Sequence, residues 1–234
     1  MRFNSILCLL MAITLLSACA QTKQARNIEH RELTGFLGDY SGLREGTDDQ
    51  ALLNYIKPGV DFRQYNRVIV DPVTIWTNPG SDLAKLSQSD RRELADRFYA
   101  RLVTEISKST PVTSEAHYGT IKIQVALTDA EKSRPVLDTV STVVPVGLAA
   151  STVKELFTGQ AAFTGSTGME IKVSDAVTGD ILAAAVDKRV GNKNLGVSTF
   201  SQWGDTDAAM EYWAQLISYR ICQYRGQMNC VYPQ

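Results

Sequence analysis

The sequence contains few of the side chains on which most catalytic and metal sites depend. It has two histidines and four cysteines in 234 residues, and these do not cluster with the spacing of metal ligands. No Gly-x-Ser-x-Gly motif is present to set a serine beside His117, and no Gly-x-x-x-x-Gly-Lys-Ser/Thr phosphate loop occurs. We therefore expect a protein that is not an enzyme and holds neither a metal ion nor another cofactor.

The sequence also lacks an excess of charge of one sign. Its 24 basic residues face 25 acidic ones, and this balance argues against a nucleic-acid partner. The apolar content of 44% is too high for a disordered chain, and four cysteines are too few for a disulfide scaffold of this length. What remains is a globular domain of ordinary size with a hydrophobic core.

The N-terminus has the pattern of a targeting segment. Arg2 precedes an apolar run from Ile6 to Leu16, which is short of the ~20 residues that a membrane-spanning helix needs. Leu16-Ser17-Ala18-Cys19 follows and resembles the lipobox of bacterial lipoproteins at every position. The resemblance implies cleavage before Cys19 and a membrane anchor of acyl chains on Cys19. The alternative is an ordinary secretory signal in which the cysteine falls by chance.

The residue after Cys19 bears on which membrane would hold the anchor. In lipoproteins of enteric type an aspartate there marks retention in the inner membrane, and this chain has Ala20. The resemblance thus implies the outer membrane, with the domain facing the periplasm. Cys222 and Cys230 would then be the remaining thiols in an oxidising compartment, and we favour a disulfide between them. Unpaired thiols, or a thiol buried in the last helix, are the alternatives.

The chain divides into three predicted regions. Residues 1–18 form the signal peptide, and residues 19–60 form a lipidated N-terminus, a tether and a loop-rich stretch that drapes over the domain. Residues 61–234 form one globular domain, and residues 135–168 are an insert within it. Asp71 and Asp187 lie in apolar strand patterns, where a carboxylate needs a partner. We expect a structural ion pair or a hydrogen-bonded bulge there rather than a catalytic pair.

Apolar periodicity predicts the elements of this domain. We expect strands over 67–76, with a bulge at Pro72, and over 120–129, a hairpin over 169–190, and helices over 88–108 and from Asp205 or Thr206 to Tyr224. Strand 120–129 and the first strand of the hairpin alternate, which predicts one face open to water. The order β-α-β-(insert)-β-β-α favours the α+β class: a two-layer domain with a mixed β-sheet and helices packed on one face.

The insert is the least ordinary part of the pattern. Its apolar residues make up a candidate partner or ligand surface: Val144, Leu148, Leu156, Phe157 and Phe163. Three interpretations compete: a helix that covers the core, an exposed surface for a partner or self-association, and a membrane-facing or pore-lining element.

An ordered set of short motifs resembles a known family. The motifs are TGFLGDYS (residues 34–41), DPV (71–73), ALTD (126–129), DAVTG (175–179) and WGD (203–205). Together, over roughly residues 33–220, they resemble the bacterial lipoprotein family of domain of unknown function 3313. The resemblance implies location and fold extent, and it carries no activity.

Our first hypothesis is therefore a non-enzymatic outer-membrane lipoprotein that binds an envelope partner or itself. The second is a carrier of a lipid or small hydrophobic ligand, with the insert and the tryptophans forming a slot. A hydrolase built on His117 is the third.

Overall fold

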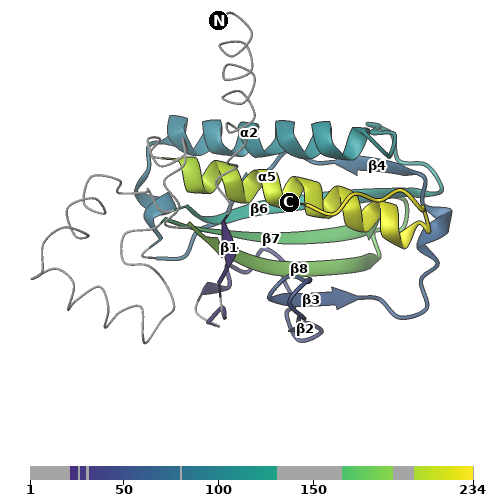
Figure 1. Cartoon of the computed structure of the whole chain (residues 1–234), viewed down its shortest axis with the longest axis horizontal. Coiled ribbons are helices and arrows are strands. Elements are labelled where there is room, and N and C mark those ends of the chain that lie inside the picture. The colour runs from purple at the N-terminus through teal and green to yellow at the C-terminus, as the bar shows by residue number, and fades with distance from the viewer. Residues whose placement is uncertain are drawn as a thin grey trace, which may run out of the picture.

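The computed structural model describes residues 22–25, 27–29, 32–79, 81–130, 165–191 and 203–233. One mixed sheet forms a layer, and two long helices, α2 (Gln88–Ser107) and α5 (Gly204–Tyr224), lie side by side on one of its faces (Figure 1). The predicted two-layer α+β architecture is confirmed. In the described part of the chain, neither helix is apolar enough over a sufficient length to cross a membrane.

The sheet combines parallel and antiparallel pairs. Its order is β2 (Arg44–Glu45), β3 (Leu53–Ile56), β8 (Ile181–Val190), β7 (Ser166–Asp175), β6 (Thr120–Ala130) and β4 (Arg67–Val70). The two-residue strands β1 (Lys23–Gln24) and β5 (Thr74–Ile75) pair with β8 and β6. Only β4 and β5 run parallel to their partner among these strands, because α2 carries the chain back between β5 and β6. Two 3₁₀ helices, η2 (Phe62–Gln64) and η3 (Asp82–Lys85), flank this unit.

Several predicted elements are confirmed within a residue or two. Ser87 caps α2 by accepting a hydrogen bond from the Asp90 backbone amide at 3.1 Å. The buried stripe of α2 is Leu94, Ala95, Phe98, Leu102 and Ile106. Strands β7 and β8 form the predicted hairpin, whose turn places Gly179 at a φ of 78°.

Two local predictions are wrong. The strand expected over 67–76 is two strands, β4 and β5, because Pro72 has no amide to donate to the sheet. Helix α5 begins at Gly204, and Trp203 stands at its N-cap without a side-chain capping bond. Asp205 and Thr206 therefore lie in the first turn and do not cap the helix.

The N-terminal stretch is part of the sheet, which corrects the predicted tether over residues 19–60. Three strands, β1, β2 and β3, precede the predicted order, and all three lie on the β8 side of the sheet. Thr22 is held against the end of β8, because the buried Arg189 donates hydrogen bonds to the Thr22 carbonyl and, at 2.7 Å, to its hydroxyl. A charged side chain that is 7% exposed needs such partners, and the N-terminal stretch supplies them.

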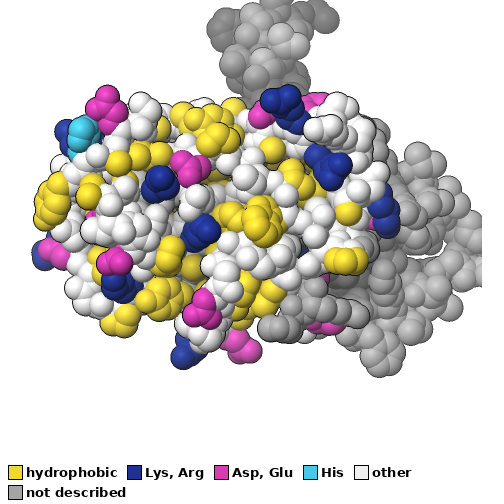
Figure 2. Space-filling view, turned by 180° about the vertical axis from the view of Figure 1, so that it is seen from behind, with side chains coloured by type: hydrophobic (Ala, Val, Ile, Leu, Met, Phe, Trp, Pro, Cys, Tyr) yellow, Lys and Arg dark blue, Asp and Glu magenta, His cyan; other side chains and the backbone are white. Residues whose placement is uncertain are grey.

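The sheet face predicted to be open to water is largely covered. Residues 32–40 cross it, and Glu170 of β7, fully buried, accepts hydrogen bonds from the Thr34 amide at 2.8 Å and the Tyr40 hydroxyl at 2.5 Å. Phe36 packs edge-on against Trp76 and lies under the Lys172 ammonium. Seen from behind, the molecule shows hydrophobic side chains between charges of both signs (Figure 2). The expectation that this stretch drapes over the domain agrees with these contacts.

Candidate functional site

An apolar groove lies between the sheet and the second half of α5. Its volume is about 160 Å³. Its sheet side is formed by the ends of β6, β7 and β8 that lie nearest the C-terminus of α5, and its helix side by Leu216, Ile217, Ile221 and Tyr224. The sheet residues that line it include Ile121, Ile123, Ile171 and Val173. Residues of β3 and of the loop before it, among them Gln50 and Ile56, also line the groove.

Three alanines of β8 explain why space remains there. The small side chains of the run Ala183-Ala184-Ala185 predict that a helix packs closely on this strand. Instead these residues are only half-buried, and α5 leaves the groove above this part of the strand. Ala183 and Ala185 lie opposite Val173 and Ile171 on the helix-facing side, so their short side chains set the depth of the groove. The expectation of close packing was wrong at this end of the sheet.

The mouth of the groove carries exposed apolar side chains. Ile56 of β3 is 38% exposed and Tyr224 of α5 is 41% exposed, and both line the groove. Ile181, at the start of β8, is 41% exposed, two residues along that strand from Ala183. Exposure of this apolar surface to water is unfavourable, so an apolar group that covered it would bind with a favourable free energy of burial.

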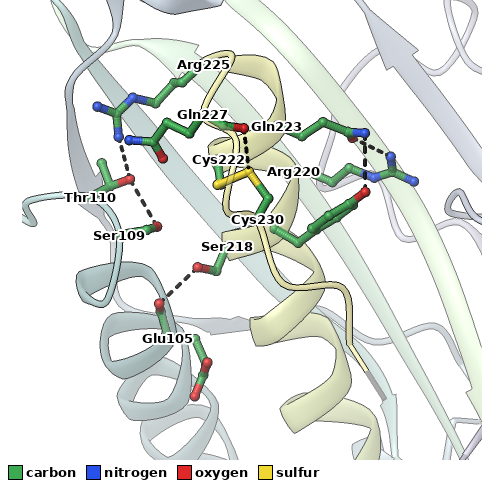
Figure 3. Close-up of a disulfide and its surroundings, with 11 residues drawn as sticks. Glu105, Ser109, Thr110, Ser218, Arg220, Cys222, Gln223, Arg225, Gln227 and Cys230 are labelled. Atoms are coloured by element: carbon green, nitrogen blue, oxygen red, sulfur yellow. Dashed lines mark hydrogen bonds between the residues drawn. A yellow bond between two sulfur atoms is a disulfide. The ribbon is translucent and has the colours of Figure 1, made fainter.

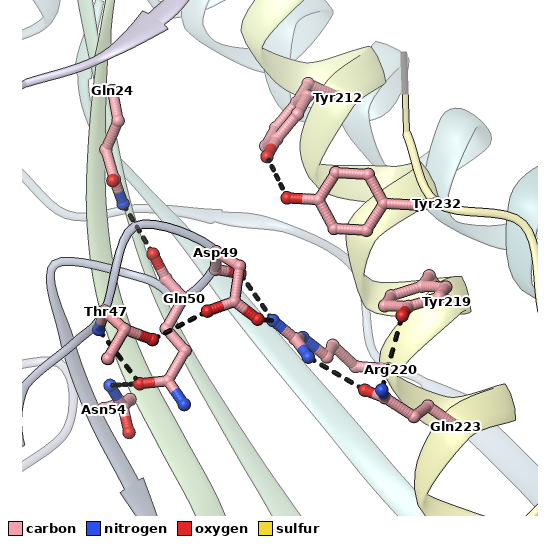
Figure 4. A network of polar contacts seen from close by, with 10 residues as sticks. All are labelled: Gln24, Thr47, Asp49, Gln50, Asn54, Tyr212, Tyr219, Arg220, Gln223 and Tyr232. Carbon is pink, nitrogen blue, oxygen red and sulfur yellow. Dashed lines mark hydrogen bonds and ion pairs between the residues drawn. The ribbon is translucent and has the colours of Figure 1, made fainter.

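Two arginines give the rim its polar part. Arg220 of α5 reaches across to the loop before β3, where it bonds the Asp49 carboxylate at 3.0 Å and the Asp49 carbonyl (Figure 4). Arg225 donates to the Thr110 hydroxyl at 2.8 Å. Among the described residues no carboxylate lies within ion-pair distance of Arg225, whereas Arg220 has Asp49. The rim therefore keeps one guanidinium whose charge no described acidic side chain neutralises.

Asp187 is a buried carboxylate with a raised pKa, two properties that are common in catalytic groups. It is 1% exposed and accepts hydrogen bonds from the Trp213 indole and the Gln24 amide, both at 2.7 Å, and from the Leu52 amide at 3.3 Å. Desolvation raises its pKa, although the bonds from Gln24 and Trp213 act in the opposite direction. Its partners join β1, the loop before β3 and α5. These contacts support the expected structural role, with hydrogen bonds in place of a direct ion pair.

The other acidic candidate is in a different position. Asp71 falls between β4 and β5 and is half-buried, and its backbone amide donates to the Ile123 carbonyl at 3.0 Å. Asp71 and Asp187 lie apart in the sheet, because β7 and β6 stand between β8 and β4. His117 is exposed and lies 2.9 Å from the Glu115 carboxylate. In the ranges that the structure describes, no group of three or more His, Cys, Asp or Glu side chains gathers where it could hold a metal ion.

The two C-terminal cysteines form a disulfide. Cys222 of α5 is bonded to Cys230, eight residues further along the chain (Figure 3). The tail then returns along α5, where Tyr232 packs edge-on against Tyr219 and lies 3.4 Å from the Tyr212 hydroxyl. The disulfide therefore holds the tail against the helix that walls the groove.

Other candidate residues of the sequence lie outside the described residues. These are Cys19 and the five insert residues, Val144, Leu148, Leu156, Phe157 and Phe163. The predicted insert is shorter at its end, because Ser166–Gly168 already belong to β7. A side chain on Gly168 would come within 2.6 Å of the Thr128 hydroxyl, which explains the glycine beside the bulge in β6.

The groove itself was missed by sequence reasoning. Its apolar lining comes from β3, η2, β4, β6, β7, β8 and α5, and each of these apolar residues is typical of core in its own segment. The alanine run in β8 was the one local signal, since small residues in a strand leave space above them. The same signal suits close packing, so it could not distinguish the two outcomes.

Comparison with known proteins shows the family to which the chain belongs. The mixed sheet with two helices on one face defines an α+β domain. The chain matches the model of the family described as Protein of unknown function (DUF3313) over residues 32–217, and it belongs to that family. The resemblance seen in the motifs is thereby confirmed. Among curated proteins none matches the chain.

Solved structures with similarity to the chain share little sequence with it. The PelC dodecamer from Paraburkholderia phytofirmans is 9% identical with a TM-score of 0.38, and the match covers 75% of this chain and 96% of that one. Protein XCC0632 from Xanthomonas campestris is 9% identical with a TM-score of 0.41, covering 73% and 91%. A DUF4136 family protein from Bacteroides thetaiotaomicron is 10% identical with a TM-score of 0.35, covering 70% and 94%.

Proposed function

We propose that this protein is a non-enzymatic lipoprotein of the bacterial outer membrane that docks an apolar segment of an envelope protein in the groove beside α5. The observation that carries the proposal is the groove itself, with apolar walls and with Ile56 and Tyr224 exposed at its mouth. Acylation of Cys19 would hold the domain in the periplasm, as the lipobox implies.

The size of the groove favours a protein side chain over a whole lipid. Its volume of about 160 Å³ is roughly half of the ~300 Å³ at which pockets for small ligands begin. It has room for one or two large apolar side chains. Protein interfaces commonly depend on a few such anchors that fill a pocket while the surrounding contacts exclude water.

Site-specific photo-cross-linking in cells tests the proposal. A photoreactive phenylalanine analogue replaces Tyr224 at the groove mouth, and in a second protein it replaces Tyr99 on the outer face of α2, which is 36% exposed. We expect a discrete adduct from position 224 and none from position 99. An adduct with a second copy of the chain would identify the partner as the protein itself.

A groove-filling variant makes the test specific. Ala185→Phe places a ring in the groove and should abolish the adduct from position 224, whereas Ala185→Ser, which leaves the space open, should retain it. An adduct that survives Ala185→Phe at full yield would show that the partner lies elsewhere. Thermal melting of both variants establishes that they are folded.

A second candidate function rests on Arg225. A guanidinium without a described carboxylate partner, beside an apolar groove, suits the tail and head of a small anionic amphiphile such as a short fatty acid. Displacement of a fluorescent fatty acid measures such binding. Arg225→Gln should weaken it at least several-fold, and Arg92→Gln, at an exposed position on α2, should not. Equal binding by the two variants would remove this candidate.

A further inference from the structure

We propose that the end of the domain at which β8 finishes lies against the bilayer, and that the groove lies at the end of the domain away from the membrane. The inference rests on the proposed acylation of Cys19 and adds an orientation to it. It follows from the length of chain between the anchor and the sheet, and from where that chain enters the sheet.

The link between anchor and domain is very short. Ala20 and Gln21 are the only residues between Cys19 and Thr22. Three residue steps span at most roughly 11 Å when the chain is fully extended. The acyl chains therefore cannot lie far from Thr22 in any conformation of this link.

Thr22 is held firmly in the domain. It is 7% exposed, and its hydroxyl and carbonyl both accept hydrogen bonds from Arg189. The Arg189 guanidinium stacks at 3.5 Å on the ring of Tyr212 in α5. The next residues form β1, in which Lys23 and Gln24 pair with Val190 and Arg189. Thr22 is therefore attached directly to the end of β8 and, through Arg189, to α5.

The N-terminal stretch joins the sheet at the end where β8 finishes. Val190 also lies opposite Ser166, the first residue of β7, and Thr167 lies opposite Ala130, the last residue of β6. Helix α5 starts at this end as well, because Gly191 is close to Asp205 in its first turn. The η3 helix belongs to the same end, since the Ser81 hydroxyl that caps it donates to Asp129 at 2.8 Å.

The groove belongs to the opposite end. Its lining includes Ile121 near the start of β6, Val173 near the end of β7, and Ala183 near the start of β8. Helix α5 contributes residues of its C-terminal half, from Leu216 to Tyr224, and its C-cap Arg225 also lines the groove. A ten-residue strand is about 30 Å long, close to three times the reach of the link to Cys19. The link therefore holds the Thr22 end of the domain near the bilayer, and the far end of β8 lies about a strand length from that point of attachment.

Quenching from the bilayer surface tests the orientation. The lipidated protein, bound to phosphatidylethanolamine–phosphatidylglycerol vesicles that carry a contact quencher on the headgroups, receives one fluorophore on an introduced cysteine. Lys85→Cys in η3 marks the Thr22 end, and Val177→Cys, in the β7–β8 turn, marks the groove end. The disulfide and the acylation of Cys19 leave the introduced thiol as the reactive one.

We expect several-fold stronger quenching at position 85 than at position 177. A long Gly/Ser linker placed after Ala20 should make the two positions nearly equal. Equal quenching without the linker, or stronger quenching at position 177, would overturn the orientation. A difference that persists with the linker would overturn the role of the short link.

The anchor is tested separately. Cys19→Ala should abolish binding to the vesicles, and retained binding would refute the lipid anchor of the proposed function. The orientation is measured only on bound protein. A failure of the anchor and a failure of the orientation therefore give different results.

Discussion

Replacement of Asp187 by alanine should destabilise the domain more than most single substitutions in it. The carboxylate is 1% exposed and accepts hydrogen bonds from the Trp213 indole, the Gln24 side chain and the Leu52 amide. These donors come from α5, β1 and the loop before β3. Without Asp187 all three would be left without this acceptor, and the buried Arg189 would lose its nearby negative charge.

The expected loss in the free energy of unfolding is about 3–5 kcal/mol. Each buried donor left unsatisfied costs about 1–3 kcal/mol, and three donors lose their acceptor in this variant. For a chain of this size, such a loss lowers the Tm by roughly 10 °C. Urea unfolding of the mature domain, followed by tryptophan fluorescence and circular dichroism, measures it.

Asp71→Ala is the matched control. Asp71 is also an aspartate in an apolar strand sequence, but it is half-buried, and the expected change is within about 0.5 kcal/mol. A loss below about 1 kcal/mol for Asp187→Ala would refute the view that this carboxylate joins the N-terminal stretch to the core. So would equal losses from the two substitutions.

The pH dependence gives an independent test of the same group. Burial raises the pKa of Asp187 above its ordinary value of 3.8. Between the unfolded and folded pKa values, the folded protein holds a proton that the unfolded chain has lost. The stability that wild type has over Asp187→Asn should therefore be greatest below pH 3.8 and fall as the pH rises through the folded pKa. A difference that grows with pH would contradict the direction of this shift.

Three further predictions concern other parts of the fold. Glu170→Ala should lower the free energy of unfolding by about 3 kcal/mol and expose the N-terminal stretch to proteases. Burial and the bond to Glu170 raise the pKa of Tyr40 to about 12, so the same substitution should lower that pKa in a spectrophotometric titration. Unchanged proteolysis would count against this contact. Replacing Cys222 and Cys230 together by serine should cost about 2.5 kcal/mol in urea unfolding, because the closed loop is short; no change would mean that the tail is held by its other contacts. Desolvation raises the pKa of Asp175, but hydrogen bonds from two backbone amides and the Tyr65 hydroxyl outweigh it, so that the pKa is lowered overall. The stability that these bonds contribute is lost as the pH falls through the lowered pKa. Asp175→Asn should therefore flatten the acid side of the plot of stability against pH, and an unchanged plot would refute this.

The position of the N-terminal stretch connects the fold to the proposals. Between Thr22 and Ile56 the chain supplies partners to both buried acidic residues, Asp187 and Glu170, and adds β3 beside the groove. A segment that reads as a tether is therefore structural. The same segment would bring the lipid anchor within a few residues of the sheet, which is why the proposed orientation follows from the fold.

The sequence by itself determined the elements whose signals are local. Apolar periodicity predicts α2 within a residue, and alternation predicts the β7–β8 hairpin. These patterns suffice because a helix stripe and a hairpin depend on residues near one another in the chain. The α+β class follows from their order.

Only the tertiary structure decided which face of the sheet was covered, which partners the buried acids have, and where a groove remains. Alternation in β7 marks Glu170 as a residue of the outer face, and no local pattern shows that residues 32–40 cover it. The alanines of β8 likewise suit a helix in close contact or an open groove. The outcome depends on the path of α5 and the return of β3, which are set by pairings between segments more than a hundred residues apart. Contacts over such separations leave no period in the sequence, so they emerge only when the chain is folded.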